Sequence, residues 1–181
     1  MLTTEQRARL IRTARESIEA VLAGRRPEVD LADFDHDLQR PSGVFVTLTL
    51  EGELRGCIGS IEPVAPLCMA VSMSAINAAF RDPRFVPLSA DEYRLVAVEI
   101  SVMGPIERVT NLEDIVVGRD GLIVSRERRT GLLLPQVATE RGWSRETFLR
   151  QTCVKAGLPP ESWKSKDILI QRFSAEVLGE E

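Results

Sequence analysis

The residues best suited to chemistry lie in one six-residue stretch, Leu54 to Gly59, which reads Leu-Arg-Gly-Cys-Ile-Gly. Cys57 offers a thiol, and Arg55 places a permanent cation two residues away, which would favour the thiolate form. Gly56 and Gly59 have no side chains, so another segment or a ligand could approach the backbone closely. Because side chains alternate along a strand, we expect Arg55 and Cys57 to share a face. Both a reactive thiolate and a cysteine that packs as a small apolar group fit this pattern.

A catalytic cysteine normally needs a base, and the sequence holds a single histidine, His36. His36 lies in an acidic stretch from Arg25 to Ser42 that has no periodicity, so we expect an irregular connector. Asp33, Asp35 and Asp37 lie beside it, but there is no second cluster of ligands elsewhere. We therefore interpret this stretch as a solvated loop and expect no metal site.

Cations from three separate stretches could converge on a carboxylate or phosphate group. They are Arg55, Arg84 and Lys155. A competing interpretation is that Arg84 and Asp82 pair with each other or cap backbone ends in a rigid loop flanked by proline. The glycines do not form a phosphate-binding loop, since the spacing matches neither of the standard nucleotide-binding motifs.

Two further side chains are suited to line a binding site. Gln136 follows a proline and could hydrogen-bond a ligand, and Trp163 could stack on one. The alternative for Trp163 is a role in the core. A third patch, Arg126 to Arg129, could touch nucleic acid, but Glu127 interrupts its positive charge, so we expect a solvent-facing hairpin tip.

Composition indicates a folded, soluble protein. The chain has 181 residues, 44% of them hydrophobic, with a formal net charge of -4. An overall negative charge makes nucleic acid and anionic lipid unlikely partners. Cys57, Cys68 and Cys153 lack metal or disulfide spacing, and no signal peptide or membrane segment is recognisable. We expect reduced thiols and a cytoplasmic location.

The positioning elements follow from periodicity and capping signals. The sequence predicts a helix from Thr3 to Gly24, a strand from Val44 to Leu50, a return strand containing Leu54 to Gly59, and a small-residue helix after Pro66. Farther along, it predicts a short capped helix at Ser89, a strand Leu95 to Met103 paired with Ile106 to Val109, a turn at Asp120-Gly121, a hairpin around 125–130, helices at 136–141 and after Ser144, and a last strand Ile168 to Val177. Strands and helices alternate without a regular repeat, which favours an α+β fold with a mixed or largely antiparallel sheet.

Four ordered blocks resemble the AMMECR domain family, whose prokaryotic members are named AmmeMemoRadiSam system protein A. They are Leu54 to Gly59, Asp82 to Phe85, Gly131 to Val137, and Cys153 to Leu158 followed by Trp163. The similarity runs from about Gly43 to Val177. The resemblance implies a larger and a smaller lobe with a cleft between them, and association with a Memo-like protein and a radical S-adenosylmethionine protein. It implies no settled reaction or cofactor.

We therefore expect one domain over residues 1–181, with its motifs in 43–177. The leading hypothesis is an accessory or substrate-binding component that works with those two partners. The alternatives are an enzyme that uses Cys57 as nucleophile or redox thiol, and a nucleic-acid-binding regulator. The predicted binding residues besides Cys57 are Arg55, Gly56, Ile58, Gly59, Asp82, Arg84, Gln136, Lys155 and Trp163.

Overall fold

The structure, a computed structural model, describes residues 1–180 as two compact units. The first unit comprises Met1–Met103 and the chain from Glu176 onward, and the second comprises Gly104–Ala175. Both boundaries fall inside strands rather than in a linker. Helices and antiparallel strands are combined in the chain, so the predicted α+β class is confirmed. No helix within residues 1–180 has both the length and the apolar composition needed to cross a bilayer.

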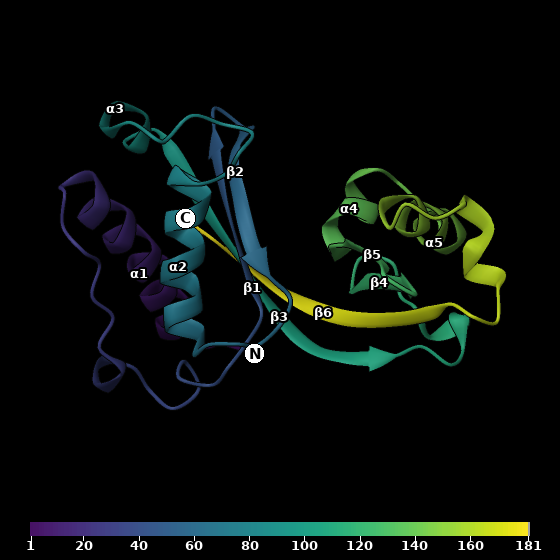
Figure 1. Cartoon of the computed structure of the whole chain (residues 1–181). Helices are drawn as coiled ribbons and strands as arrows, with labels where there is room; N and C mark the ends of the chain where they lie inside the picture. The colour runs from purple at the N-terminus through teal and green to yellow at the C-terminus, as the bar shows by residue number, and fades with distance from the viewer. Residues whose placement is uncertain (181) are drawn as a thin grey trace. The chain divides into compact units, whose positions relative to one another are not determined.

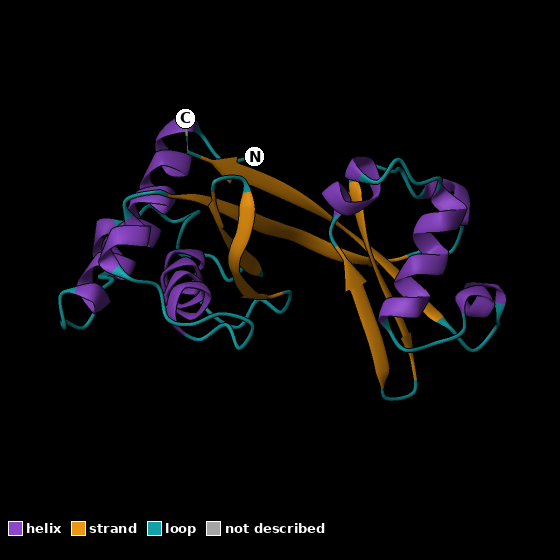
Figure 2. Ribbon diagram, turned by 90° about the horizontal axis from the view of Figure 1, so that it is seen from above, coloured by secondary structure: helices purple, strands orange, loops and turns teal. Residues whose placement is uncertain are grey.

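Within residues 1–180, six strands and five α-helices follow one another without a regular repeat (Figures 1 and 2). The hydrogen-bonded strand order is β2-β1-β3-β6-β4-β5. In chain order the elements are α1 (Thr4–Leu22), η1 (Leu31–Asp33), β1 (Val44–Leu50), β2 (Glu53–Ser60), α2 (Leu67–Phe80), α3 (Ala90–Tyr93), β3 (Val96–Arg108), η2 (Leu112–Asp114), β4 (Asp120–Arg126), β5 (Arg129–Leu133), α4 (Pro135–Glu140), α5 (Arg145–Lys155), η3 (Pro160–Lys164) and β6 (Leu169–Gly179).

In the first unit, α1 and α2 lie on the same side of the strands β1 and β2 (Figure 1). Helix α1 begins at the predicted capping box, in which Thr3 and Gln6 bond each other's backbone N–H groups. Its apolar stripe is buried against α2 and the sheet, with Leu10, Ala14 and Ile18 fully inaccessible to solvent. The amphipathic pattern therefore fixes which face of α1 packs inward.

Strand β1 shows the alternation that its sequence predicts. Val44, Val46 and Leu48 are buried in the core, whereas Thr47 and Thr49 are half-buried on the other face. The tight turn Glu51-Gly52, with positive φ at both residues, returns the chain into β2. The stretch Leu54 to Gly59 consequently forms most of a strand at one end of the sheet order.

Helix α2 packs on β2 at a distance that requires glycine. A Cβ atom placed on Gly56 would lie 2.1 Å from the carbonyl oxygen of Ala78 in α2. The small residues along α2, among them Ala75 and Ala78, are fully buried at this contact. The predicted close approach of this helix to the Gly-Cys segment is thus confirmed.

The second unit has its own core between the helices α4 and α5 and the strands β4 and β5 (Figure 1). Phe148 and Cys153 of α5 and Leu122 of β4 are fully buried there. Strand β5 also approaches α5 closely, because a Cβ on Gly131 would lie 2.3 Å from the backbone nitrogen of Ala156. Two separate cores explain why the chain divides into two units.

Two local predictions are wrong. Residues 106–109 do not form a partner for the strand before them, because β3 continues unbroken from Val96 to Arg108 through Gly104-Pro105. Asp120-Gly121 is not a turn but the start of β4, where Gly121 makes room for the ring of Phe173 on β6. In both places glycine serves close packing between strands, which a sequence pattern does not distinguish from a turn.

The glycine contact with α2 yields a stability prediction. We expect Gly56→Ala to lower the free energy of unfolding by about 1–3 kcal/mol, because backbone must shift to admit the methyl group. Gly179→Ala is the matched control, since nothing lies within 4 Å of a Cβ placed there. Urea denaturation monitored by circular dichroism measures both. Equal stability of the two variants would contradict the packing argument.

Candidate functional site

Arg55 occupies an irregular position in β2. The register with β1 shifts between Leu48 and Thr49, so that Gly56 opposes Leu48, Leu54 opposes Thr49, and Arg55 has no partner. This extra residue is a β-bulge, which redirects a side chain and increases local twist. Simple alternation therefore does not hold across Arg55, and the expectation that Arg55 shares a face with Cys57 loses its basis.

The redirected Arg55 side chain is buried and bound by the segment before and within α3. Its Nε and Nη2 atoms donate to the two carboxylate oxygens of Glu92 at 2.8 and 3.0 Å, and Nη2 also donates to the carbonyl oxygen of Val86 at 3.0 Å. The Arg55 guanidinium, with an N–H bond from Ser89, lowers the pKa of Glu92 to about 2. A bidentate ion pair of this kind fixes the relative orientation of the two side chains as well as pairing their charges.

Asp82 binds the outer edge of β2 at Cys57. One oxygen of the buried Asp82 carboxylate accepts the backbone N–H of Cys57 at 2.9 Å. Arg84 donates to both oxygens of Asp82, at 3.0 and 2.7 Å, and reaches the carbonyl oxygen of Cys57 at 3.3 Å. The Asp82–Arg84 pair therefore occupies both backbone groups of Cys57, as a neighbouring strand would.

This arrangement decides between the two interpretations of the arginines. Asp82 and Arg84 pair with each other and bind an edge strand, and Arg55 pairs with Glu92. The guanidinium of Arg84, followed by the N–H bonds from Cys57 and Arg84, holds the pKa of Asp82 well below its usual range. Much of the positive charge predicted for an anion clamp is thus neutralised by internal carboxylates.

Cys57 has the only partly exposed thiol of the three cysteines. Thr47 on β1 donates its hydroxyl to the Cys57 sulfur at 3.3 Å, across a directly paired position. Burial raises the pKa of the Cys68 and Cys153 thiols, which lie in the two cores. His36 is exposed in the connector after α1.

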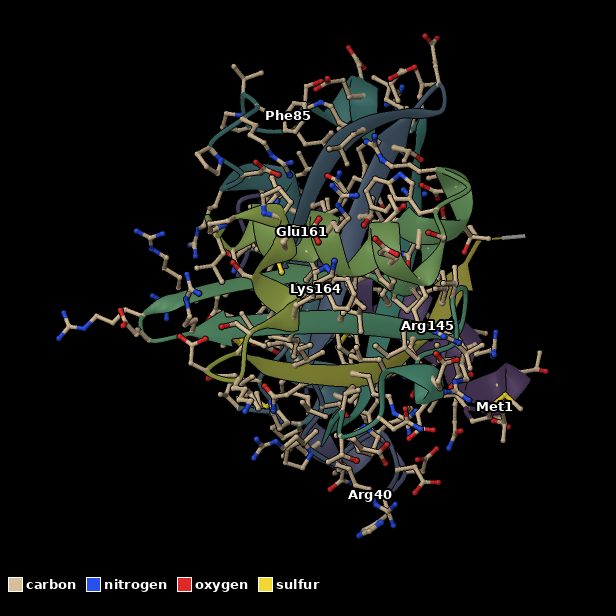
Figure 3. The ribbon with its side chains drawn as sticks, turned by 90° about the vertical axis from the view of Figure 1, so that its right-hand side faces the viewer. Met1, Arg40, Phe85, Arg145, Glu161 and Lys164 are labelled. Atoms are coloured by element: carbon tan, nitrogen blue, oxygen red, sulfur yellow. The ribbon has the colours of Figure 1, made fainter. Side chains whose placement is uncertain are left out.

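The remaining predicted site residues belong to the second unit. Lys155 is exposed at the end of α5, and Gln136 lies in the first turn of α4. Trp163 lies in η3, packed on the second core, with Lys164 over its ring at 5.0 Å. Lys164 also pairs with Glu161 at 2.7 Å (Figure 3). That these residues border one cleft with Arg55 and Cys57 stays a prediction.

Three of the predicted site residues share one unusual property. Within residues 1–180, only three buried side-chain nitrogen or oxygen atoms have no hydrogen-bond partner. They are Nη1 of Arg55, Oε1 of Gln136 and Nε1 of Trp163. An orphaned buried polar atom costs free energy, so it requires an explanation such as a bound ligand or an ordered water.

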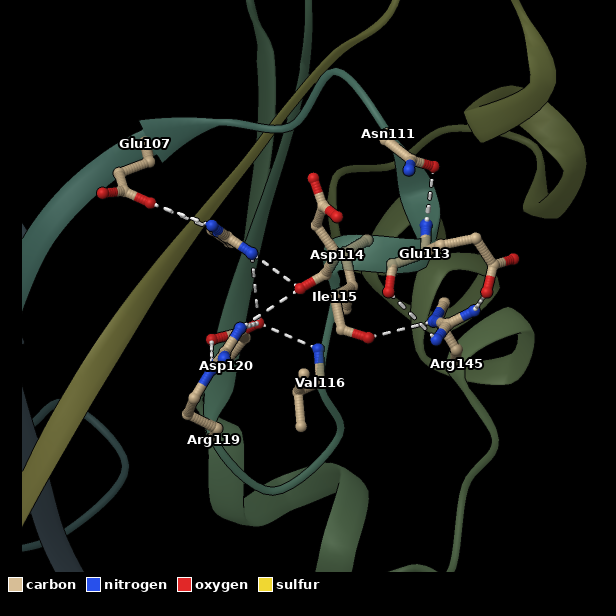
Figure 4. Close-up of polar contacts among 10 residues, drawn as sticks. Glu107, Asn111, Glu113, Asp114, Ile115, Val116, Arg119, Asp120 and Arg145 are labelled. Atoms are coloured by element: carbon tan, nitrogen blue, oxygen red, sulfur yellow. Dashed lines mark hydrogen bonds and ion pairs between the residues drawn. The ribbon is translucent and has the colours of Figure 1, made fainter.

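Sequence reasoning missed two charged partners. Glu92 was recognisable only as a helix-capping residue, and nothing in the sequence pairs it with Arg55. Asp120 is the second: it is 3% exposed and accepts from Arg119 Nε and from the backbone N–H of Val116 (Figure 4). Arg119 and Arg172 also both donate to the Asp114 carbonyl, so this network fixes a loop.

The acidic residues around His36 make local contacts in the connector after α1. Over residues 1–180, no three side chains of His, Cys, Asp or Glu are grouped as metal ligands. The aspartates around His36 instead make local contacts, since Asp35 accepts the backbone N–H groups of Asp37 and Leu38.

The Asp82 contact gives a direct stability prediction. We expect Asp82→Asn to lower the free energy of unfolding by about 2–3 kcal/mol, because a buried acceptor of charge-assisted bonds is lost. Asp91→Asn on the exposed side of α3 is the control and should change it by less than about 0.5 kcal/mol. Chemical denaturation of both variants is the measurement. If Asp82→Asn lowers the free energy of unfolding by less than Asp91→Asn does, the edge contact contributes nothing to stability.

The same carboxylates predict how stability depends on pH. The pKa values of Asp82 and Glu92 are lowered in the folded protein, so the unfolded chain binds more protons in acid. Their contribution is complete above the unfolded value of about 4 and is lost as pH falls toward about 2. We expect the melting temperature to drop over this range, and less steeply in Asp82→Asn/Glu92→Gln. Parallel curves would contradict this assignment.

Comparison with known proteins agrees with the sequence blocks. The AMMECR1 family model matches residues 11–178. Protein PF1979 of Pyrococcus furiosus is 44% identical over 95% of this chain and 87% of its own length. Protein MJ0810 of Methanocaldococcus jannaschii is 40% identical over 99% of this chain and 92% of its own length.

A solved structure extends this agreement to the fold. The crystal structure of the uncharacterised protein PH0010 from Pyrococcus horikoshii superimposes with a TM-score of 0.86. It is 43% identical and is covered over 88% of its length, against 93% of this chain. Sequence blocks, family model and backbone shape lead to one conclusion: this chain belongs to the AMMECR1 family.

Proposed function

We propose that this protein is an accessory component that binds a small molecule and acts together with a Memo-like protein and a radical S-adenosylmethionine protein. The observation that carries the binding role is the set of orphaned atoms on Arg55, Gln136 and Trp163. All three residues were selected from the sequence as binding residues. Within residues 1–180, they also carry the only buried side-chain nitrogen or oxygen atoms that have no hydrogen-bond partner.

The chemistry of these atoms restricts the ligand class. Nη1 of Arg55 and Nε1 of Trp163 are donors, whereas Oε1 of Gln136 is an acceptor. Arg55 keeps its charge although Glu92 neutralises part of its field. A ligand with carbonyl or carboxylate oxygens would satisfy the donors, and an amide or hydroxyl group would satisfy Gln136. Arg55 belongs to the first unit, and Gln136 and Trp163 belong to the second, so each unit by itself offers unpaired polar atoms to a small polar organic molecule that carries such groups.

The surroundings of Cys57 favour binding over independent catalysis. Asp82 and Arg84 are committed to the backbone of β2, and Thr47 is the hydroxyl partner of the thiol. Nucleophilic cysteines are activated by an adjacent base or a strongly electropositive setting. The two arginines near the thiol are each paired with a carboxylate, so they provide neither a base nor a strongly electropositive setting in full. The partner assignment rests on the family resemblance, and a cytoplasmic location is part of the same proposal.

The proposal predicts that a substitution at Gln136 preserves stability but abolishes ligand binding. We expect Gln136→Leu to keep or slightly raise the free energy of unfolding, because it removes an unpaired buried acceptor. We expect the same variant to lose a small molecule that the wild-type protein retains. Native mass spectrometry after purification, alone and with the proteins encoded beside it, identifies the retained mass. Gln151→Leu on the exposed face of α5 is the matched control.

Each outcome has a distinct meaning. Destabilisation by Gln136→Leu would show that ordered water satisfies the atom and that it is structural. Retention of the same mass by wild type, Gln136→Leu and Trp163→Phe would remove the binding proposal. Cys57→Ala tests the enzymatic alternative: if it retains the ligand but abolishes its turnover by the purified protein alone, the chain is an enzyme.

A further inference from the structure

The outward face of α2 is unusual for a solvent-exposed helix. None of the fourteen residues from Leu67 to Phe80 is charged. Met69 and Met73, one turn apart, are 37% and 55% exposed, so the helix presents methionine side chains to solvent. Flexible, polarisable methionines are typical of surfaces that adapt to a peptide partner. An uncharged, exposed helix face of this kind is typical of an interaction surface.

Two hollows meet on this face, and Met73 and Asn77 border both. The first, about 140 Å³, lies between α2 and β2 and is mostly apolar, with Ile58, Val64 and Ala70 in its lining. The second, about 350 Å³, runs from Met73 and Ile76 to the segment after α1. We call the two hollows together the α2 groove. It lies wholly within the first unit.

The α2 groove carries positive charge, whereas the first unit as a whole is negatively charged. The first unit has 11 Lys and Arg against 18 Asp and Glu. The larger hollow nevertheless contains Arg25, Arg26 and Arg81 and no acidic side chain. No carboxylate of residues 1–180 lies within ion-pair distance of these three arginines. The smaller hollow has one charged residue, Glu62. The groove is thus apolar in the middle and positive at one end.

Neighbouring hollows do not remove this asymmetry. Arg25 and Arg26 also border a hollow on α1 that contains several acidic residues, among them Glu16 and Asp33. Arg81 lines the α2 groove and not the hollow on α1, and it donates to Oδ1 of Asn77 at 3.3 Å. Among the three arginines, Arg81 is therefore the one whose substitution tests binding in the groove most directly.

The wall formed by β2 adds backbone hydrogen-bonding capacity. The N–H of Cys57 points away from β1 to Asp82. Because backbone direction repeats every two residues in an antiparallel strand, Gly59 directs its N–H and C=O to the same edge. Gly59 lines the smaller hollow, beyond the reach of the Asp82–Arg84 contact with Cys57. An extended peptide can pair with such an edge.

We propose that the α2 groove binds an extended peptide segment of a partner protein in which apolar residues are followed by acidic ones. The apolar residues occupy the hollow around Met73, and the carboxylates face Arg81, Arg25 and Arg26. This inference rests on the proposed accessory function, because it names the surface through which a partner would dock. Nucleic acid and anionic membranes fit less well, since the unit is acidic and no aromatic ring lines either hollow.

Nuclear magnetic resonance titration of the full chain tests this proposal. The probe is a synthetic ten-residue peptide of alternating leucine and valine followed by three glutamates, and the matched probe carries lysines in place of the glutamates. We expect saturable amide shifts at Ile58 to Ser60 and Met73 to Arg81 with the acidic peptide only. We expect Arg81→Glu to weaken this binding by about tenfold or more and to favour the lysine peptide, and Met73→Glu to weaken binding of the acidic peptide.

Arg94→Glu is the control, because Arg94 is exposed in the same unit and lines neither hollow. It should leave the affinity within about twofold. Equal shifts with both peptides, or none at millimolar concentration, would overturn the proposal. Binding to phosphatidylglycerol vesicles or inorganic phosphate without a preference for the peptide would also overturn it. Failure here with small-molecule retention intact would leave the proposed binding function standing.

Discussion

The bond from the Cys57 backbone N–H to the Asp82 carboxylate organises the first unit around its edge strand. A strand at the end of a sheet exposes unpaired backbone groups, which invite pairing with another chain. Here Asp82 and Arg84 supply the missing acceptor and donor, so that a loop takes the place of a strand. Pro83 between them stiffens the connection. Because the loop follows α2 directly, the same contact fixes the end of that helix relative to β2.

The loop contact also explains how charge is distributed around the Leu54 to Gly59 segment. Arg55 and Arg84 each meet a carboxylate, so the segment combines rigid geometry with little excess charge. One nitrogen of Arg55 is left without a hydrogen-bond partner, and Cys57, whose thiol accepts from Thr47, is half-buried. A rigid frame with a few unsatisfied polar atoms is suited to holding a ligand in a defined orientation. It is less suited to generating a nucleophile.

Elements predicted from the sequence agree with the structure where local physics decides them. The capping boxes at Thr3 and Ser89 begin α1 and α3, and the alternation from Val44 to Leu50 identifies the buried face of β1. These signals act over three or four residues and need no partner. The continuation of β3 through Gly104 and the start of β4 at Asp120 were missed, because there glycine fits against a distant strand rather than forming a turn.

The same distinction between local signals and contacts with distant segments applies to the candidate site. The sequence by itself determined the family, the fold class, the strand that carries Cys57 and the residue types able to bind, because these depend on pattern and motif. Only the tertiary structure decided that Arg55 lies in a bulge and pairs with Glu92, and that Asp82 and Arg84 bind the backbone of Cys57. Those outcomes join residues 25 to 37 positions apart, and no local signal records which distant carboxylate or backbone group a long, flexible side chain will meet.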